Sequence, residues 1–372
     1  MKKLSFGFIE TVSICIGITV LICLLMFNYM VTPVSYEEKW RDVEIPEGST
    51  FTDSINILKE KGLIKSGLGM LLMGRISRSD RDIKAGYYNL SESMTPLQIF
   101  KNLVEGRTIQ YTVTIPEGSE LRKIRKQFLK ADLMDDESWQ LVYDEEFMQS
   151  LDIDAPSLEG YLYPDTYKFS KGTKPETIFK IMVQRMKENF DEPLLQRAEE
   201  LGMSDHEILT LASIIEREAI YDNERPKISA VFHNRLKKNM RLQADPTVLY
   251  GVKKRWKRIR YRDLKRKTPY NTYRFKGLPP GPIASPGIKS IRAALYPSDH
   301  DYLYFVAKND GRHYFSKTNK EHSKAVVQYQ LNGVSKFKKD KKSINKTDCP
   351  WRDQDRRKCA CCRPVHDQDR YL

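Results

Sequence analysis

Residues 11–36 carry no formal charge, and this stretch constrains the chain more than any other. Its most apolar part, residues 12–30, is rich in Ile, Leu, Val and Cys. About 20 helical residues, each rising 1.5 Å, cross a hydrocarbon core of roughly 30 Å. We therefore predict a transmembrane anchor over residues 11–33, after a short N-terminal segment of residues 1–10. A cleaved signal peptide and a buried core helix are the alternatives, but the run is long for a signal core and no small-residue cleavage pattern follows it.

Charged residues on both sides of this stretch predict its orientation. Lys2 and Lys3 precede it, and Glu37 and Glu38 follow it. The positive-inside rule then places the N-terminus in the cytoplasm and everything after residue 36 on the other side of the membrane. Because no later segment has a comparable apolar run, the sequence predicts a single-pass protein of the cell membrane with a large extracytoplasmic part.

The charge of the chain is unevenly distributed. The 372 residues include 63 Lys and Arg against 49 Asp and Glu, which gives a formal net charge of +14. Residues 253–276 hold twelve basic residues and one acidic residue, and residues 336–372 hold twelve and six. Such an excess predicts an anionic partner, which is nucleic acid, a membrane surface or an acidic polymer. The aromatic residues within 253–276 would suit single-stranded nucleic acid in a cytosolic protein, but the predicted topology places them outside, so we expect no nucleic-acid partner.

The cysteines and histidines do not form a familiar metal or cofactor motif. Cys15 and Cys23 lie in the predicted anchor, and the other four cysteines crowd the last 24 residues near His366. Their spacing, C-x9-C-x-C-C-x3-H, matches none of the usual zinc patterns, so we interpret residues 336–372 as a basic, disordered tail that is open to oxidation. The sequence also has no H-E-x-x-H, P-loop or G-x-S-x-G motif. We therefore predict no metal and no cofactor.

A short motif occurs twice in the first half of the chain. Residues 43–49 read V-E-I-P-E-G-S, and residues 113–119 read V-T-I-P-E-G-S. Each copy runs from a short β-prone stretch through a turn into a helical pattern, which covers residues 51–61 after the first copy and residues 121–129 after the second. The glycine of each copy suits the turn, and the serine stands where a helix N-cap belongs.

Both copies fall in residues 40–155, which we predict to be a region of small strand-helix units. Docking onto carbohydrate or protein, and simple spacing of a later domain from the membrane, are both consistent with this pattern. A break at Ala155-Pro156 then begins a longer domain over residues 156–335. Within it, apolar periodicity predicts scaffold helices over residues 175–189 and 192–201.

The next predicted helix carries two carboxylates with different surroundings. Ser204 followed by Glu207 matches a capping box, and the helix continues to residue 219. At 100° per residue, Glu216 and Glu218 lie 160° apart, on opposite edges of the buried stripe. There, desolvation could raise a carboxyl pKa and suit the group to general acid catalysis. Periodicity alone favours the simpler interpretation, in which both are ordinary boundary residues paired with Arg217 or Arg225.

Polar residues and turn motifs follow this helix. After a predicted helix over residues 226–239, the polar residues Gln243, Asp245 and Thr247 alternate with apolar neighbours in residues 240–251. We interpret this stretch as extended, with the three side chains on one face that could hydrogen-bond a sugar or its amide. The stiff, turn-rich stretch G-L-P-P-G-P-I-A-S-P-G could present backbone groups to a ligand or be a long connector.

Five of these motifs, taken in order, resemble the MltG/YceG-like endolytic murein transglycosylases. The similarity covers roughly residues 40–330 and includes a K-A-G-Y-Y region that is LysM-like in that family, as well as the stretch around His313. The five motifs are E-G-Y-L-Y-P-D-T-Y (159–167), L-A-S-I-I-E-R-E (211–218), R-L-Q-A-D-P-T-V-L-Y-G (241–251), Y-N-T-Y (270–273) and G-L-P-P-G-P-I-A-S-P-G (277–287).

The resemblance implies an α+β fold and a set of site residues. A single N-terminal transmembrane helix would precede a small LysM-like β/α subdomain in residues 40–155 and a larger mixed α/β catalytic domain in residues 156–335. The family's catalytic glutamate corresponds to Glu218. The resemblance further implies that the residues binding substrate are Gln243, Asp245, Thr247, Asn271, Glu159 and Tyr163.

The resemblance also implies an activity. Such an enzyme cleaves the β-1,4 bond between N-acetylmuramic acid (MurNAc) and N-acetylglucosamine (GlcNAc) in nascent peptidoglycan, leaves 1,6-anhydroMurNAc ends and terminates strand elongation. The implied partners are glycan strands, the cytoplasmic membrane, peptidoglycan synthases and proteins of cell-wall elongation or division. A non-catalytic glycan-binding scaffold remains an alternative, as does a muramidase-type hydrolase that uses Asp245 as a second carboxylate.

Overall fold

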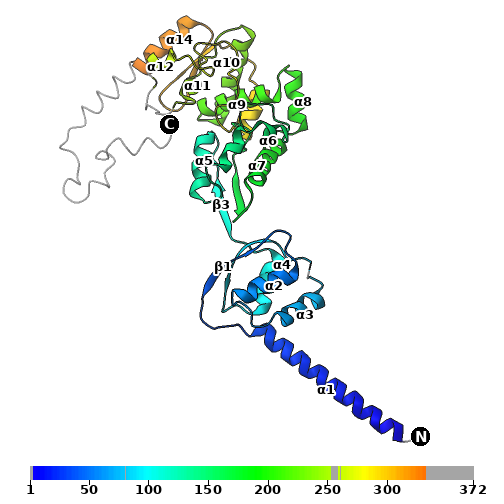
Figure 1. The fold of residues 1–372 in the computed structure, drawn as a ribbon. Helices are drawn as coiled ribbons and strands as arrows, with labels where there is room; N and C mark the ends of the chain where they lie inside the picture. The colour runs from blue at the N-terminus through cyan, green and yellow to red at the C-terminus, as the bar shows by residue number, and fades with distance from the viewer. Residues whose placement is uncertain (1–2, 80, 253–258, 260, 332–372) are drawn as a thin grey trace, which may run out of the picture. The chain divides into compact units, whose positions relative to one another are not determined.

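The computed structural model describes residues 3–79, 81–252, 259 and 261–331 (Figure 1). The chain divides into two compact units. Among the described residues, unit 1 comprises those up to Asp191 together with Ala284–Gly287, and unit 2 comprises those of Glu192–Ile283 and of 288–331. The cysteine-rich tail lies outside the described residues, and so do residues 253–258 and 260 of the charge run that begins at residue 253.

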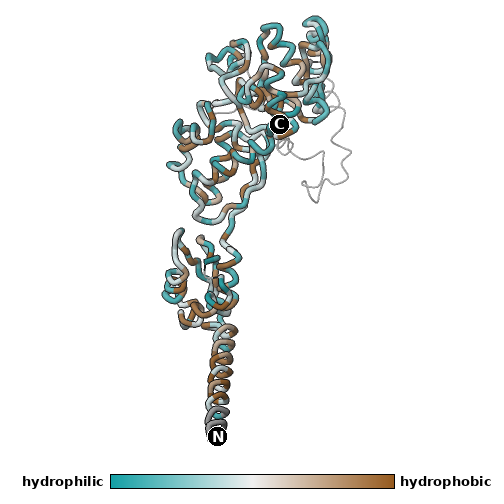
Figure 2. Tube along the Cα trace, turned by 90° about the vertical axis from the view of Figure 1, so that its right-hand side faces the viewer, coloured by the Kyte–Doolittle hydropathy of each residue, from teal (hydrophilic) through white to brown (hydrophobic). Residues whose placement is uncertain are grey.

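Unit 1 begins with one long apolar helix, α1 (Lys3–Val31). Its segment Glu10–Val31 is long and apolar enough to cross a membrane, and none of its most apolar window is buried within the protein. Figure 2 shows this hydrophobic character along the length of the helix. The helix is consistent with the predicted anchor, and its orientation stays a prediction.

The small module of unit 1, residues 40–105, follows α1. It contains β1 (Trp40–Ile45), α2 (Phe51–Glu60), α3 (Gly67–Ser77), β2 (Gly86–Ser91) and α4 (Pro96–Glu105). β1 and β2 pair antiparallel, and side chains from all five elements enclose one hydrophobic core. The core includes Val43, Leu58, Met70, Tyr88 and Ile99. The LysM-like character expected for this region stays a prediction.

The second part of unit 1 is built around another antiparallel strand pair. Its elements are β3 (Gln110–Thr114), α5 (Leu121–Lys130), η1 (Ser138–Tyr143), α6 (Glu145–Gln149), β4 (Thr166–Ser170) and α7 (Pro175–Asn189). Because β3 pairs with β4, the chain beyond residue 155 belongs to the same unit. The compact units therefore divide after Asp191, whereas the sequence placed the domain boundary after residue 155.

The two copies of the repeated motif form the expected turns, and the helices begin at Phe51 and Leu121 as predicted, but each N-cap lies one residue later than predicted. Gly48 and Gly118 have φ values of 81° and 69°, in the left-handed region that favours glycine. The N-cap positions are Thr50 and Glu120, so the prediction of Ser49 and Ser119 was wrong by one residue. The motif is therefore a turn that ends before the cap.

We expect Thr50→Ala to destabilise α2 by about 0.5–2 kcal/mol, because Thr50 and Asp53 form a reciprocal capping box. Thr52→Ala, at an exposed position of the same helical turn, is the matched control and should change stability little. Amide hydrogen exchange across α2 measures the free energy of local opening. Equal exchange in the two variants would contradict the capping role.

Unit 2 consists of helices packed around the helix that carries the two carboxylates. Helices α8, α10, α11 and α13 contact α9, and a β5–β6 strand pair and α14 complete the unit. The elements are α8 (Glu192–Glu200), α9 (Asp205–Glu218), η2 (Asp222–Glu224), α10 (Arg225–Lys237), α11 (Asp245–Leu249), α12 (Tyr261–Leu264), α13 (Ile288–Leu295), β5 (Tyr304–Ala307), β6 (His313–Ser316), α14 (Asn319–Val326) and η3 (Val327–Leu331). Helices and antiparallel strand pairs in the described residues confirm a mixed α/β organisation.

The structure corrects the interpretation of residues 240–251 as an extended segment. Asp245 begins the short helix α11, and Pro246 occupies its first turn, where a fixed φ and a missing N–H are tolerated. In a helix, residues two positions apart point in different directions. Asp245 and Thr247 therefore do not share one face, and Thr247 is buried.

The glycine- and proline-rich stretch after residue 276 joins the two units. Its residues 284–287 belong to unit 1, where the backbone of Ser285 exchanges two hydrogen bonds of 2.8 Å with Gly118 and Ser119. A Cβ atom at Gly287 would overlap the Glu117 side chain, which would have to move to make room. The stretch thus packs against the second copy of the repeated turn.

Candidate active site

Helix α9 places the Glu218 carboxylate at the wall of a cavity in unit 2. The helix begins with a reciprocal capping box between Ser204 and Glu207, and its residues from Ile208 to Ile215 are buried. It ends at Glu218 because Ala219 adopts an extended conformation, with ψ of 130°. A helix anchored by its buried body therefore holds the Glu218 side chain in a fixed place.

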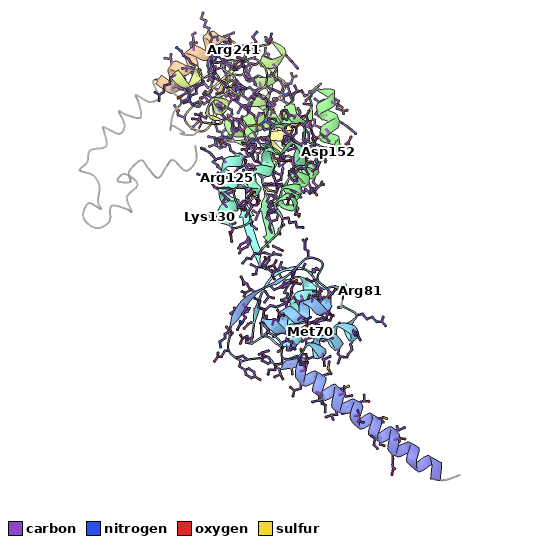
Figure 3. All side chains as sticks on the ribbon, viewed as in Figure 1. Met70, Arg81, Arg125, Lys130, Asp152 and Arg241 are labelled. Atoms are coloured by element: carbon purple, nitrogen blue, oxygen red, sulfur yellow. The ribbon has the colours of Figure 1, made fainter. Side chains whose placement is uncertain are left out.

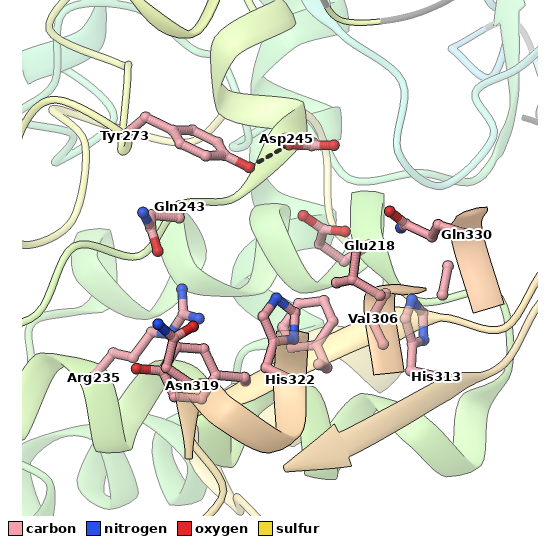
Figure 4. A pocket seen from close by; sticks show the side chains of 14 residues that line it. Glu218, Arg235, Gln243, Asp245, Tyr273, Val306, His313, Asn319, His322 and Gln330 are labelled. Atoms are coloured by element: carbon pink, nitrogen blue, oxygen red, sulfur yellow. Dashed lines mark hydrogen bonds between the residues drawn. The ribbon is translucent and has the colours of Figure 1, made fainter. Parts of the chain in front are cut away.

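The cavity beside Glu218 has a volume of about 500 Å³ (Figure 4). Most of its lining side chains are polar or aromatic, which suits a polar ligand with hydrophobic ring faces. All of them come from unit 2. They include Glu218, Arg235, Gln243, Asp245, Tyr273, Tyr304, His313, Asn319, His322 and Gln330.

The surroundings of Glu218 favour its protonated form. Burial raises its pKa to about 8, and the negative charge of Asp245 adds to the increase. The Asp245 backbone N–H, Arg217 and Arg235 act in the opposite direction but do not cancel it. Glu218 is therefore largely protonated near neutral pH, which is the form that a general acid requires.

Asp245 is held in place by an aromatic hydroxyl. The Tyr273 Oη donates a hydrogen bond of 2.6 Å to Asp245 Oδ1, drawn as a dashed line in Figure 4. Burial and the charge of Asp245 raise the pKa of Tyr273, so it remains a donor. The pair fixes a second carboxylate at the cavity.

The other carboxylate near the end of α9, Glu216, is held in a buried ion pair. Glu216 Oε1 lies 3.1 Å from Arg225 Nη1, and both side chains are buried. The Ser290 hydroxyl donates to Glu216 Oε2 at 2.8 Å. Periodicity could not distinguish the two carboxylates, but their contacts do. Glu216 is bound within an ion pair, whereas Glu218 faces the cavity.

The remaining predicted residues of unit 2 support the loops around the cavity. Thr247 and Asn271 are fully buried. The Thr247 hydroxyl donates to the Ala244 carbonyl at 2.7 Å, and the Asn271 amide donates to the Leu264 and Arg266 carbonyls at 3.0 and 2.7 Å. These side chains donate hydrogen bonds to backbone carbonyls of the loops, and they are not among the residues that line this cavity.

Glu159 and Tyr163 lie in unit 1, and each is buried there. The Glu159 carboxylate accepts hydrogen bonds of 3.1 and 3.2 Å from the Leu121 N–H, at the start of α5. The Tyr163 carbonyl accepts a hydrogen bond of 2.8 Å from the Tyr167 hydroxyl. Both contacts are structural, and neither residue belongs to the cavity of unit 2, so substrate binding by these two residues stays a prediction.

Several cavity residues were missed by the sequence reasoning. Arg235 is buried on α10, where its Nε donates to the Leu303 carbonyl at 2.7 Å and its guanidinium lies over the Tyr304 ring. The sequence did indicate that Arg235 is buried, because Arg235 follows Val231 and Phe232 at helical spacing and so shares their buried face. His322 stacks on Tyr304 with ring centroids 5.3 Å apart, and burial lowers the pKa of His322.

His313, which the resemblance marked, forms a buried pair at the cavity wall. Its Nδ1 lies 2.8 Å from Glu224 Oε2, and its backbone N–H donates to Glu224 Oε1 at 3.1 Å. A carboxylate that accepts from Nδ1–H fixes the imidazole tautomer and leaves Nε2 for other partners. His313 thus brings an oriented imidazole to the cavity.

We expect Asp245→Asn to lower the pKa of Glu218, because it removes a neighbouring negative charge that raises it. Above its pKa, Glu218 loses the proton that it needs as an acid, so the alkaline limb of the pH–activity profile should move to lower pH. Asp301→Asn, at an exposed ion pair with Lys317, is the control and should leave the profile unchanged. An unmoved alkaline limb in Asp245→Asn would refute the coupling.

Comparisons with known proteins agree with these motifs. The model of the YceG-like family matches residues 43–328. The endolytic murein transglycosylase of Bacillus subtilis (strain 168) is 37% identical over 320 residues, covering 81% of this chain and 88% of that protein. The protein of the same name from Streptococcus pneumoniae serotype 2 (strain D39 / NCTC 7466) is 31% identical over 325 residues, and the match spans 78% of this chain and 59% of that protein. The 2.6 Å crystal structure of a yceG-like protein from Listeria monocytogenes is 39% identical, with a TM-score of 0.53, and covers 77% of this chain and 98% of that one.

Proposed function

The chain belongs to the YceG-like family, and on that premise we propose that it is an endolytic murein transglycosylase that cleaves the MurNAc–GlcNAc β-1,4 bond of peptidoglycan. The main support for this reaction is the Glu218 carboxyl group, which lines the cavity and has a pKa raised to about 8. A carboxyl group that keeps its proton at neutral pH can donate it to a glycosidic oxygen.

The reaction needs one group that serves first as acid and then as base. Glu218 donates its proton to the oxygen between the two sugars as the bond to the MurNAc C1 breaks. The resulting carboxylate then accepts the proton of the C6 hydroxyl, whose oxygen closes onto C1 to give the 1,6-anhydro ring. The proton returns to Glu218, no water is consumed and the enzyme is regenerated.

We assign the neighbouring groups to stabilisation and orientation. Positive charge develops at C1 as the leaving oxygen departs, and the Asp245 carboxylate, fixed by Tyr273, can stabilise it electrostatically. Gln243, Asn319 and Gln330 line the same cavity and offer amide donors and acceptors to hydroxyl and acetamido groups. The His313 Nε2 is a further hydrogen-bonding group at this wall.

A muramidase-type hydrolase is the second candidate, and one observation keeps it open. Asp245 and Glu218 face one cavity, and glycosidases that activate water or form a covalent intermediate use such a pair. Digestion of purified glycan strands followed by muropeptide mass analysis distinguishes the reactions. We expect ends that are lighter by one water than hydrolysed ends. Reducing ends would support the hydrolase, and intact strands would support the non-catalytic scaffold.

We further propose that the protein acts at the membrane where strands are made. The support for this proposal is the segment Glu10–Val31 of α1, which is long and apolar enough to span a bilayer, together with the lysines before that segment and the glutamates after it. Cleavage close to a growing end would terminate elongation and would bring the protein near peptidoglycan synthases and proteins of elongation or division. Reporter fusions at each end test the orientation, and a cytoplasmic C-terminus would overturn it.

A further inference from the structure

Helix α3 exposes an apolar stripe that the small module does not cover. Leu68, Leu72 and Ile76 follow one another at intervals of four residues, so they lie along one side of the helix. Their exposed fractions are 73%, 46% and 74%. The opposite side, with Met70 and Met73, is buried in the module core. A helix that is apolar on both sides lacks the polar face of an ordinary surface helix.

The stripe belongs to a helix that is fastened to the end of α1. The Tyr29 hydroxyl donates to the Ser66 carbonyl at 2.5 Å, immediately before α3 begins. The Tyr29 ring lies so close to Gly69 that a Cβ atom there would overlap it. Tyr29 is two residues from the end of α1, and α1 contacts both α3 and α4. The position of α3 is therefore set by the last turn of α1.

The length of α1 places this junction at the edge of a bilayer. The 22 residues of Glu10–Val31 extend about 33 Å at 1.5 Å each, which is close to the roughly 30 Å of a hydrocarbon core. The last turn of such a helix reaches the headgroup region. Because Tyr29 holds α3 at that turn, the exposed stripe lies at the level where acyl chains meet headgroups.

The residues around the stripe have the composition of a membrane interface. Lys61, Lys65, Arg75 and Arg78 are exposed, and residues 61–79 contain no acidic residue. Figure 3 marks Met70 on the inner side of the helix. Basic side chains beside an apolar face are attracted to anionic headgroups. Tyr36, which is 86% exposed just after α1, is a residue type enriched at this depth.

We propose that α3 is an interfacial helix, with Leu68, Leu72 and Ile76 inserted at the headgroup–acyl boundary of the bilayer that α1 spans. The inference rests on the proposed membrane anchor and adds to it a second contact with lipid. One transmembrane helix alone leaves the attached domain free to tilt. An apolar stripe beside it fixes the small module against the bilayer surface and so sets the module's orientation.

Depth measurement with spin labels tests the proposal on the full-length chain. The native cysteines are replaced by serine, and single cysteines at 68, 72 and 76 carry a nitroxide. The protein is reconstituted in vesicles of phosphatidylethanolamine and phosphatidylglycerol. Collision rates with oxygen, which enters lipid, are compared with those of a water-soluble nickel chelate. Labels at Leu21 in α1 and at the exposed Asn56 of α2 serve as the lipid and water references.

The expected result is a ratio of oxygen to nickel collisions at all three positions that clearly exceeds that at Asn56 and approaches that at Leu21. A ratio equal to that at Asn56, with Leu21 in lipid, would overturn the interfacial helix and leave the anchor intact. A ratio at Leu21 equal to that at Asn56 would overturn the anchor itself. Labels shielded from both reagents, or dipolar coupling between labels of two chains, would show a protein partner or a second copy on the stripe and would also overturn the proposal.

Discussion

Glu218→Gln is expected to abolish the release of 1,6-anhydro ends while unit 2 stays folded. Glutamine matches the shape of glutamate but can neither donate a proton to the glycosidic oxygen nor accept one from the C6 hydroxyl. Loss of general acid–base catalysis costs about 10²–10⁴-fold in rate, and here one residue performs both transfers. Muropeptide analysis of glycan strands digested with equal amounts of folded protein measures the loss.

Glu216→Gln is the matched control, because it makes the same chemical change two residues earlier on the same helix. Glu216 contacts Arg225 and Ser290 and is not among the residues that line the cavity, so this substitution should affect stability rather than the chemical step. Turnover per folded molecule should stay near that of the parent protein. Anhydro ends from Glu218→Gln at parental rates would exclude Glu218 as the acid.

The raised pKa of Glu218 also predicts how stability changes with pH. An unfolded glutamate titrates near pH 4.3, whereas burial and Asp245 raise the folded pKa to about 8. The folded state therefore holds the proton more tightly, and unit 2 loses stability as pH rises from about 4 through 8. Glu218→Gln removes this loss, so at pH 9 the variant should melt at a higher temperature than the parent, and at pH 4 at a similar one. A variant that is inactive but more stable at pH 9 would show that its loss of activity does not come from unfolding.

Local signals were sufficient to predict most of the helices. The helix predicted over residues 175–189 matches α7, where Pro175 stands at the first turn and the apolar residues recur at helical spacing. The capping box of Ser204 and Glu207 likewise located the start of α9. In contrast, α3 was not predicted, because its apolar residues face both the core and the outside and therefore give no clear period.

The candidate site could be predicted only in part, because partners distant in sequence decide the role of each residue. Periodicity placed Glu216 and Glu218 symmetrically, and the contacts with Arg225 and with Asp245 distinguish them. Glu224 and His313 are 89 residues apart, so no local pattern could reveal their pair. Polar residues in a motif can also stabilise the loop that contains them, as the hydrogen bonds of Asn271 to two backbone carbonyls illustrate.

Arg225→Met is expected to give the largest loss of stability among the substitutions considered. It leaves the Glu216 carboxylate buried without the guanidinium that lies 3.1 Å from it. It also removes the hydrogen bond of 2.5 Å from Arg225 to Ser290 and the ion pair at 3.2 Å with Asp222. Breaking one partner of a buried ion pair costs about 3–5 kcal/mol, because the remaining charge loses its compensation. Unfolding of unit 2 in the full-length protein, followed by amide hydrogen exchange in α9 and α10, measures the change.

The double variant Glu216→Gln/Arg225→Met tests whether that cost arises from the stranded charge. Replacement of a buried ion pair by neutral groups is often close to neutral in stability, so the double variant should regain most of what Arg225→Met loses. Lys289→Met removes a cation from Asp222 in the same network, but its side chain is largely exposed, and we expect a loss of at most about 1 kcal/mol. If the effects of Glu216→Gln and Arg225→Met simply added, the ion pair would not be the source of the stability, and the two residues would act through independent packing contacts.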